Sequence, residues 1–329
     1  MESTELHPGK LLELSGSYWQ TCTLHGGVKL DIFTAIGNDN LAAGEVAEKI
    51  GSPVRSLAML LDALSAMNLL TKDHDKYCNT TLSSTFLSKE SPRYVGFMIM
   101  HHHHLVESWS RLDESVMSGK SVRTRSSFEE DKQRESFLMG MFNIAMATAP
   151  GLVPTIDLTG KKHLLDLGGG PGTYAIQFCL QNPDLTAVVF DLPTTRPFAE
   201  KTIERFDQQN RITFQSGDFL KDPIEGEYDV VWISHILHGD SPSDCDRIVQ
   251  KAASVLQPGG MIIIHDFILN NKKDGPLFPA LFSLNMLLGT DGGQAYSEQE
   301  LMTMLEKAGF SNIVRTSYKG PMESGLVIG

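Results

Sequence analysis

Residues 164–176, LLDLGGGPGTYAI, place a glycine-rich turn between an apolar run and a helix-like run. Open α/β sheets bind nucleotides at such a turn, because glycines let the backbone approach a ligand closely. Alone the turn is a weak signal, since the same topology holds dinucleotides and a purely structural turn is also possible. The surrounding strands therefore have to identify the ligand.

After Gly160, short apolar runs alternate with helical ones, at 163–168, 186–192, 212–219, 228–234 and 261–269. Near-continuous apolar strands separated by helices indicate a parallel sheet covered on both faces. Two later β-like runs, 313–318 and 325–328, predict a terminal hairpin on that sheet. We expect the α/β class, with a Rossmann-like domain over 151–329 whose seven-stranded sheet is mostly parallel and ends in an antiparallel hairpin.

The chain before this domain is helical in pattern. Residues 24–36, 42–50 and 56–69 predict helices, and 69–82 predicts two short strands joined by a polar turn, which completes a winged helix over 1–95. These 95 residues hold 8 Lys and Arg against 11 Asp and Glu. Phosphate attraction is therefore missing, so an interaction or dimerisation role is favoured over DNA binding.

Residues 96–150 look largely helical, and we expect a connector that lines the substrate pocket, interrupted by an exposed polar loop at 118–133. It contains four consecutive histidines, His101 to His104. On a helix only His101 and His104 share a face, and spacing identifies no third ligand, so packing or pocket lining is favoured over a metal site. We expect no metal in the protein.

The overall composition limits the classes of partner that we expect the protein to bind. A net charge of −12 and a pI near 5.4 argue against nucleic acid or an anionic membrane as a partner. The start MESTELHPGK lacks the pattern of a secretory signal, and no run reaches the roughly 18 apolar residues of a membrane helix. We expect a cytoplasmic protein with a small-molecule substrate.

Three successive predicted strands end in an acceptor. Asp166 precedes the glycine turn, Asp191 ends the next strand, and Asp218 with Phe219 follows the third. Asp191 is placed to accept both ribose hydroxyls, Asp218 to accept from an adenine amino group, and Phe219 to stack on the ring. The structural alternative for each Asp is a helix N-cap. Taken together, the set fits a nucleoside without phosphate.

These motifs resemble the two-domain small-molecule O-methyltransferases. The resemblance covers nearly the whole chain, through DLGGGPG at 166–172, VVFDLP at 188–193, GDF at 217–219, ILH at 236–238, LQPGG at 256–260 and a SLNMLLGTDGGQAYSEQEL segment at 283–301. It implies S-adenosylmethionine as cofactor, S-adenosylhomocysteine as product, and a homodimer formed through the N-terminal domain. The expected cofactor-binding residues are Met146, Asp166, Gly168, Gly169, Gly170, Asp191, Leu192, Asp218, Phe219, Ser234 and His235.

The same resemblance makes His238 the general base. Here the sequence departs from the family. Gly239 stands where the family has an Asp, Asp240 where it has a Trp, and Ala295 where it has a later Glu. Those acidic side chains orient the histidine and stabilise its protonated form. Asp240 or Asp266 is a possible substitute. The alternative is a histidine at a helix start with no catalytic duty.

An apolar substrate pocket is expected from side chains that recur at helical spacing. Each of these alone is more often core than substrate contact. Asn285, a polar residue inside SLNML, is expected to hydrogen-bond the substrate. The expected substrate-binding residues are His104, Met141, Phe142, Phe282, Asn285 and Met286.

The reaction most strongly indicated is methyl transfer to a hydroxyl of a phenol-like or enol-like molecule. C- or N-methylation, or a non-methylating reaction with the cofactor merely bound, remains an alternative because of the residues after His238. A winged-helix regulator that senses the cofactor is a third possibility, opposed by the acidic N-terminal domain. The sequence does not identify the acceptor, since residues on many helices shape such pockets.

Overall fold

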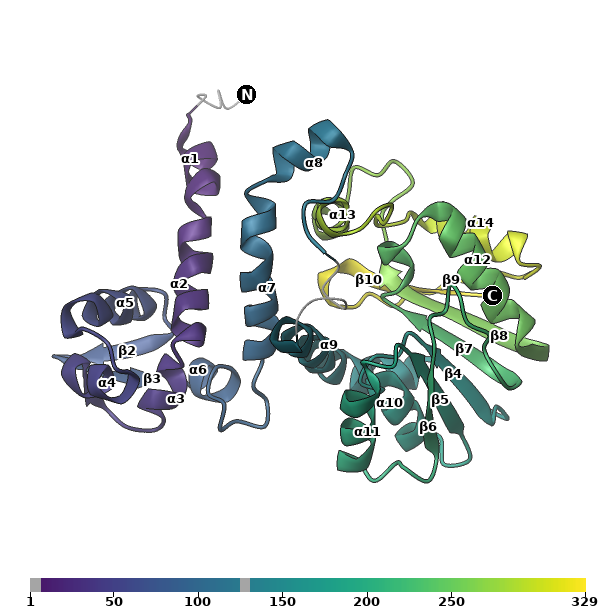
Figure 1. Cartoon of the computed structure of the whole chain (residues 1–329), viewed down its shortest axis with the longest axis horizontal. Helices are drawn as coiled ribbons and strands as arrows, with labels where there is room; N and C mark the ends of the chain where they lie inside the picture. Colours follow the sequence, from purple (N-terminus) through teal and green to yellow (C-terminus); the bar gives the residue numbers. More distant parts are fainter. Residues whose placement is uncertain (1–6, 125–130) are drawn as a thin grey trace. The chain divides into compact units, whose positions relative to one another are not determined.

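The computed structural model describes residues 7–124 and 131–329 of the 329-residue chain. The described chain forms two compact units, Met1–Leu105 and Val106–Gly329, and the division falls inside helix α7 (Gly96–Trp109). Figure 1 shows the elements of each unit. The division into 1–95, 96–150 and 151–329 stays a prediction.

The first unit packs helices around a small sheet. Its helices are α1 (Gly9–Gly16), α2 (Tyr18–Lys29), α3 (Ile32–Ile36), α4 (Ala43–Ile50), α5 (Val54–Ala66) and α6 (Thr81–Phe86). Strands β2 (Leu70–Asp73) and β3 (Lys76–Asn79) form the predicted antiparallel hairpin, and β1 (Leu41–Ala42) adds a third strand that sequence patterning missed. Buried Phe33, Leu61 and Leu64 centre its core.

The helix predicted over 24–36 is wrong in detail. It is two helices, α2 and α3, because the chain turns at Leu30 and Asp31, and Asp31 adopts the left-handed backbone conformation with φ 58°. A right-handed helix does not continue through a residue in the left-handed conformation, so α2 ends before Asp31. Helix α1, which lies before the first predicted helix, was also missed.

Along the sequence, helices α8 (Leu112–Ser118) and α9 (Asp131–Leu152) flank the stretch predicted as an exposed loop. Residues 125–130 of that stretch lie outside the described residues, while Ser118 and Gln133 belong to helices. The helical stretch Gln133–Thr155 is long and apolar enough to pass for a membrane span, with half of its most apolar window buried inside the protein. Its apolar side chains serve the core, because Ala149, Leu152 and Val153 are buried there.

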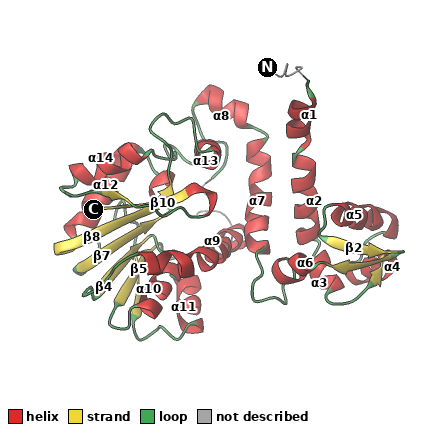
Figure 2. Ribbon diagram, turned by 180° about the vertical axis from the view of Figure 1, so that it is seen from behind, coloured by secondary structure: helices red, strands yellow, loops and turns green. Residues whose placement is uncertain are grey.

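The second unit is built on a seven-stranded sheet in the order β6-β5-β4-β7-β8-β10-β9. Strands β4 to β8 pair parallel with one another, and β10 pairs antiparallel with β8 and β9, which confirms the predicted fold class and terminal hairpin (Figure 2). The strands are β4 (His163–Leu167), β5 (Thr186–Asp191), β6 (Ile212–Ser216), β7 (Tyr228–Ser234), β8 (Leu256–Phe267), β9 (Val314–Arg315) and β10 (Ser324–Ile328).

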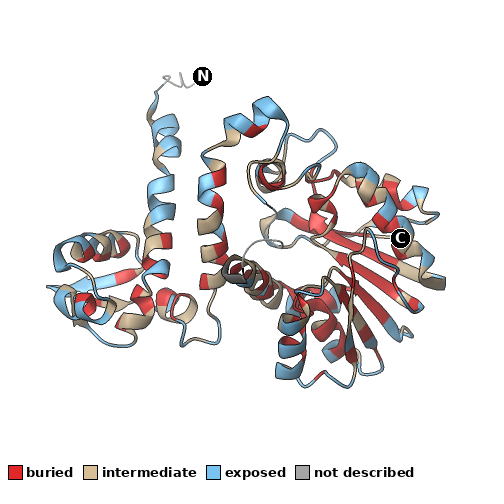
Figure 3. Ribbon diagram, in the orientation of Figure 1, coloured by how far each residue is buried: buried red, intermediate tan, exposed pale blue. Residues whose placement is uncertain are grey.

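The two faces of the sheet carry separate apolar cores, as Figure 3 shows by the buried colouring of its strands. Neighbouring residues of a strand point to opposite faces, so Val230 and Trp232 enter one core, while Val231 and Ile233 enter the other. The first core is completed by α9, α10 (Thr173–Gln181) and α11 (Arg196–Arg205). The second is completed by α12 (Pro242–Ser254) and α14 (Glu298–Lys307). Helix α13 (Leu277–Gly289) follows β8.

Candidate functional site

The turn after β4 has a backbone that favours glycine. Gly168 and Gly170 have φ of 70° and 55°, in the left-handed region where a side chain is strained. A Cβ on Gly168 would collide with Ile236 and would approach Phe219 Cε1 to 3.6 Å. The two side chains therefore lie close to the turn, and glycine at 168 permits the close approach of Ile236 to the backbone.

Asp166 lies beneath this turn and is 1% exposed. Its Oδ2 accepts a hydrogen bond from the Ala175 backbone N–H at 3.1 Å, and its Oδ1 has no hydrogen-bond partner. A Cβ on Gly169 would come within 2.6 Å of the Asp166 carboxyl carbon, so this glycine also serves close approach. Burial raises the pKa of Asp166 to about 7.

This raised pKa predicts a pH-dependent stability. An unfolded Asp loses its proton near pH 4, whereas folded Asp166 loses it near pH 7. Between these values the folded state binds more protons, so the free energy of unfolding should fall as pH rises, by up to about 4 kcal/mol. Asp166→Asn cannot ionise and should flatten this slope in urea unfolding at pH 5 and pH 7.5. Equal slopes in the variant and the wild type would refute the assignment.

Asp191 ends β5, one strand from Asp166, and is held in place by three donors. Its Oδ2 accepts from the Gly170 backbone N–H at 2.8 Å. Its Oδ1 accepts from the Leu192 N–H at 2.6 Å and from the Thr195 hydroxyl at 3.0 Å. These bonds fix the orientation of the carboxylate at the carboxyl end of β5.

Asp218 follows β6 and is engaged by its own loop. Its Oδ1 accepts from the Leu220 N–H at 2.9 Å, and its Oδ2 accepts from Lys221 Nζ at 2.8 Å. Burial alone would raise its pKa, but Lys221 and these hydrogen bonds hold the pKa below its ordinary value. The carboxylate is thus kept ionised. Its contact with Lys221 was not foreseen from the sequence.

His238 lies in a short 3-10 turn after β7, Leu237–Gly239, and is anchored to Asp266 of β8. The distance from His238 Nδ1 to Asp266 Oδ1 is 2.6 Å, and both side chains are largely buried. Burial would raise the pKa of Asp266, but the charges of His238 and His235 and the hydrogen bond from His238 hold it well below its ordinary value. Asp266 therefore stays ionised. Of the two substitutes considered for the missing family acid, the geometry selects Asp266.

The turn that carries His238 is fixed at both ends. The Asp266 carboxylate also accepts from the Phe267 N–H at 2.8 Å, which orients it within β8. After the turn, the Ser241 side chain caps α12 by accepting from the Asp244 N–H. Phe282 packs edge-on against the His238 ring with centroids 4.7 Å apart. The histidine is therefore held by a charge on one side and an aromatic ring on another.

Two further histidines adjoin this pair. His235 has φ 57°, a left-handed conformation that costs about 1–2 kcal/mol in a residue other than glycine. Its Nδ1 lies 3.6 Å from Asp266 Oδ1. His265 Nδ1 lies 2.9 Å from the Ser234 hydroxyl, and burial with the nearby His235 lowers the pKa of His265 well below its ordinary value. His265 is thus neutral.

Helix α13 brings Asn285 next to an arginine that sequence reasoning missed. Arg123 Nη2 donates to both Asn285 Oδ1 and the Asn285 backbone oxygen at 3.3 Å. A Cβ on Gly289 would collide with that guanidinium, so Arg123 lies directly across the helix. Arg123 falls in the stretch predicted to be an exposed loop. Only its long-range pairing to α13, which no local pattern encodes, reveals its place.

The remaining predicted pocket residues lie on several different helices. Met146 Sδ lies 3.8 Å from Gln177 Nε2 on α10, and Met286 is buried on α13. Phe142 is buried with the Arg205 guanidinium over its ring, on the α11 side of α9. Met141 is half-buried on the same helix. His104 belongs to the other unit, so its distance from His238 is not defined.

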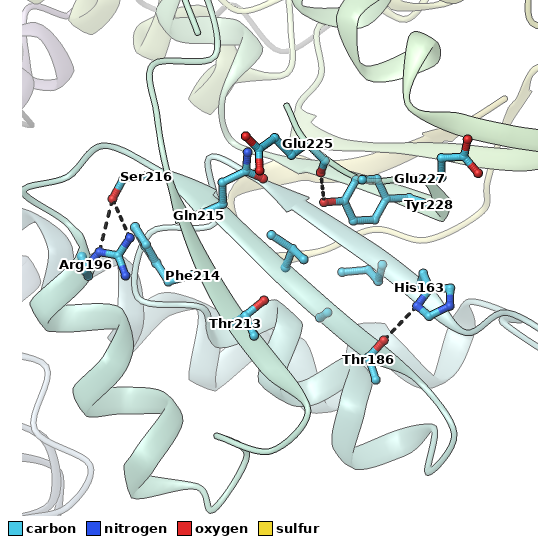
Figure 4. A pocket seen from close by; sticks show the side chains of 14 residues that line it. His163, Thr186, Arg196, Thr213, Phe214, Gln215, Ser216, Glu225, Glu227 and Tyr228 are labelled. Carbon is cyan, nitrogen blue, oxygen red and sulfur yellow. Dashed lines mark hydrogen bonds between the residues drawn. The ribbon is translucent and has the colours of Figure 1, made fainter. Parts of the chain in front are cut away.

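A hollow of about 710 Å³ lies elsewhere on the sheet, over β4, β5 and β6. Figure 4 shows it lined by polar groups that already pair with one another. Arg196 donates to the Ser216 hydroxyl, and His163 Nδ1 lies 3.0 Å from the Thr186 hydroxyl. It shares none of its lining residues with the predicted site, which lies at the carboxyl ends of the strands, where open α/β sheets bind ligands.

Comparison with known proteins shows the family of the chain. The O-methyltransferase domain family matches residues 113–311, more than half of the chain, and the O-methyltransferase dimerisation domain family matches residues 12–89. The chain belongs to the O-methyltransferase family. It is an S-adenosylmethionine-dependent O-methyltransferase.

Relatives match over nearly full length. The 3-hydroxy-5-methyl-1-naphthoate 3-O-methyltransferase of Streptomyces sahachiroi is 31% identical, covering 98% of this chain and 95% of the relative. An O-methyltransferase family protein from Burkholderia thailandensis has a TM-score of 0.88 at 29% identity, over 99% of this chain and 98% of that one. The structure of PigF with SAH has a TM-score of 0.90 at 26% identity, over 98% and 99%.

The residues at the strand ends fit this O-methyltransferase's cofactor. At the glycine turn the backbone lies directly against Ile236 and near Phe219, with no side chain of Gly168 between them. Beneath it, Asp166 Oδ1 is a buried acceptor without a partner. A nucleoside joined to an amino-acid tail carries hydroxyls and an ammonium that need such acceptors.

Proposed function

We propose that this O-methyltransferase methylates a hydroxyl of a small phenol-like or enol-like acceptor, with His238 as general base. The 2.6 Å hydrogen bond between His238 Nδ1 and the buried, ionised Asp266 carries the proposal. A neutral hydroxyl is a poor nucleophile, and a positioned base that removes its proton contributes about 10²- to 10⁴-fold in rate.

His238 and Asp266 have different roles in the proposed reaction. Asp266 accepts the Nδ1 proton of His238, which fixes the tautomer and leaves Nε2 to accept the proton of the acceptor hydroxyl. When the imidazole gains that proton, the adjacent carboxylate stabilises its charge. Phe282, edge-on to the same ring, limits its rotation. S-adenosylmethionine, when bound, supplies the electrophilic methyl group.

The cofactor is assigned to the turn after β4 and the neighbouring strand ends. Asp191, already oriented by Gly170 and Leu192, accepts from the ribose hydroxyls. Asp218 accepts from the adenine amino group while Phe219 covers the ring. The remaining proposed cofactor contacts are Met146, Asp166, Gly168, Gly169, Ser234 and His235.

The acceptor is assigned to the space beside His238 and α13. Phe282 presents an aromatic surface next to the base, and Asn285 presents an amide that Arg123 orients. Offset or edge-on packing against Phe282 favours a flat, aromatic or enolic acceptor. Met141, Phe142, Met286 and His104 are kept as proposed contacts.

A panel of small phenols and enols tests the reaction. With S-adenosylmethionine present, we expect an acceptor to gain the mass of one methylene unit, and proton–carbon correlation spectra should place the new methyl on oxygen. A new methyl on carbon or nitrogen would overturn the assignment to hydroxyl acceptors. Acceptor loss without any methyl gain would indicate the non-methylating alternative.

We also propose that the enzyme is a cytoplasmic homodimer formed through its first unit. The dimerisation domain family matches residues 12–89. Within that unit, α1 and the start of α2 expose large apolar side chains, which is a sign of an interaction surface. These side chains are Leu11, Leu12, Leu14, Tyr18 and Trp19, between 60% and 72% exposed. Their burial between two copies would remove this apolar area from water.

A charge placed in this surface should separate the subunits. Leu14→Glu combined with Trp19→Glu puts two carboxylates where apolar contact is proposed, so we expect a shift from dimer to monomer in light scattering after size exclusion. Met117→Glu is the matched control, because Met117 is 87% exposed on the other unit. A double variant that stays dimeric would exclude this surface as the interface.

A further inference from the structure

The Asp–His pair has a third neighbour that the proposed base chemistry does not require. Ligand atoms of His235, His238 and Asp266 all lie within 4.8 Å of one another. Among the residues that the structure describes, no other three His, Cys, Asp or Glu side chains come this close together. His235 Nδ1 is buried and lacks a hydrogen-bond partner, 3.6 Å from Asp266 Oδ1.

We propose that His235, His238 and Asp266 form a binding site for a divalent transition-metal ion such as Zn²⁺, and that an ion bound there stops methyl transfer. Two imidazoles and a carboxylate are a donor set that suits zinc, and three protein ligands with one open position are typical of exchangeable zinc sites. The proposal revises the expectation of no metal, and its second half depends on His238 being the base.

The backbone already aims these groups at one point. His235 holds a left-handed conformation at the end of β7, with its N–H donating to the His265 oxygen at 2.8 Å. Asp266 lies on the adjacent strand, where its carboxylate can serve as a ligand beside the two histidines. Zinc–ligand bonds of about 2.0–2.2 Å require His238 and Asp266 to separate slightly from their 2.6 Å contact.

An ion in this position would disable the base through its tautomer. His238 can bind the ion through Nδ1 only if the Nδ1 proton leaves and Nε2 carries the remaining proton. Nε2 then donates and cannot accept the proton of the acceptor hydroxyl. The ion also takes the Asp266 charge that would stabilise a protonated imidazole. Inhibition should therefore fall on turnover.

The histidine run on α7 is the competing locus for metal. His103 Nε2 lies 3.0 Å from Lys29 Nζ, and an ammonium at that distance repels a second cation. His103 also packs against His25, whose pKa is lowered to about 4 by burial and by its histidine neighbours. Any binding at this run has to be separated from binding at His235.

The test is calorimetric titration of full-length, tag-free, cofactor-free enzyme with ZnCl₂, with Co²⁺ absorption reporting the ligand geometry. His235→Asn is the test variant, because Asn tolerates the left-handed backbone better than other residues. We expect Zn²⁺ affinity to fall by about 10- to 100-fold or more. The control, His102→Ala with His103→Ala, should keep wild-type affinity at the remaining site, and circular dichroism should show all proteins folded.

Turnover is measured in the same proteins with and without a chelator, each relative to its own metal-free rate. Zn²⁺ should stop the wild type and should stop His235→Asn only at correspondingly higher concentrations. Undiminished Zn²⁺ affinity in His235→Asn, or loss of binding in the His102/His103 control, overturns the metal site. If His238→Ala lowers turnover in chelator while no Zn²⁺ binds to the wild type, the base stands and the metal site fails.

Discussion

Replacing His238 by Ala should lower kcat by about 10²- to 10⁴-fold, while the Kd for S-adenosylhomocysteine stays near that of the wild type. The imidazole is the only proposed proton acceptor, and its partner Asp266 is too deeply buried to reach the substrate. Removal of the ring leaves positioning and the cofactor intact. Kinetics should be measured in chelator, with cofactor binding followed separately by calorimetry.

Asp266→Asn should lower kcat in the same direction, since a neutral amide keeps the shape but cannot stabilise a protonated imidazole. His163→Ala is a matched control, because His163 is exposed at the start of β4 and lies outside the proposed site. Wild-type turnover in His238→Ala would remove the assigned role. It would then favour a reaction driven by alignment alone, such as methylation of a nucleophile that is already ionised.

Replacing Asp191 by Ala should weaken binding of S-adenosylhomocysteine by at least about 10²-fold. Each hydrogen bond to a charged group contributes about 1.5–3 kcal/mol, and two ribose hydroxyls are assigned to this carboxylate. Every 1.4 kcal/mol is a tenfold change in Kd. The variant also loses the bonds to Gly170 and Leu192, so thermal unfolding should be followed alongside.

Two further variants serve as comparisons in the Asp191 experiment. Asp191→Asn keeps one acceptor oxygen and should lose less affinity than Asp191→Ala. Asp184→Asn changes an exposed carboxylate just before β5 and should bind like the wild type. Unchanged affinity in Asp191→Ala, or uptake of NAD in place of the S-adenosyl ligand by the wild type, would contradict the assigned cofactor geometry.

Local patterns were sufficient for the sheet and its glycine turn. Runs such as YDVVWIS and HLLDL alternate between two buried faces, and that burial can be recognised from composition alone. The hand of the connections between parallel strands then follows from the right-handed crossover rule. The carboxyl ends of β4, β5 and β6 consequently meet at one edge, so Asp166, Asp191 and Asp218 were predictable as neighbours.

Patterns failed where a single backbone conformation or a long-range contact decided the outcome. Asp31 breaks one amphipathic pattern into α2 and α3 through a left-handed φ that periodicity does not register. Arg123 joins α13 across more than 160 residues of sequence, through hydrogen bonds that no local spacing encodes. Neither feature has a signature in a window of 15 residues.

The sequence by itself determined the fold class, because periodic burial is a local property, and its resemblance to the O-methyltransferases implied the cofactor and the candidate base. Only the tertiary structure decided which acid serves His238. Asp266 is 28 residues away, and strand pairing between β7 and β8 brings its carboxylate to 2.6 Å. The same pairing placed His235 beside both, since parallel neighbours in a sheet bring together side chains that the chain keeps apart.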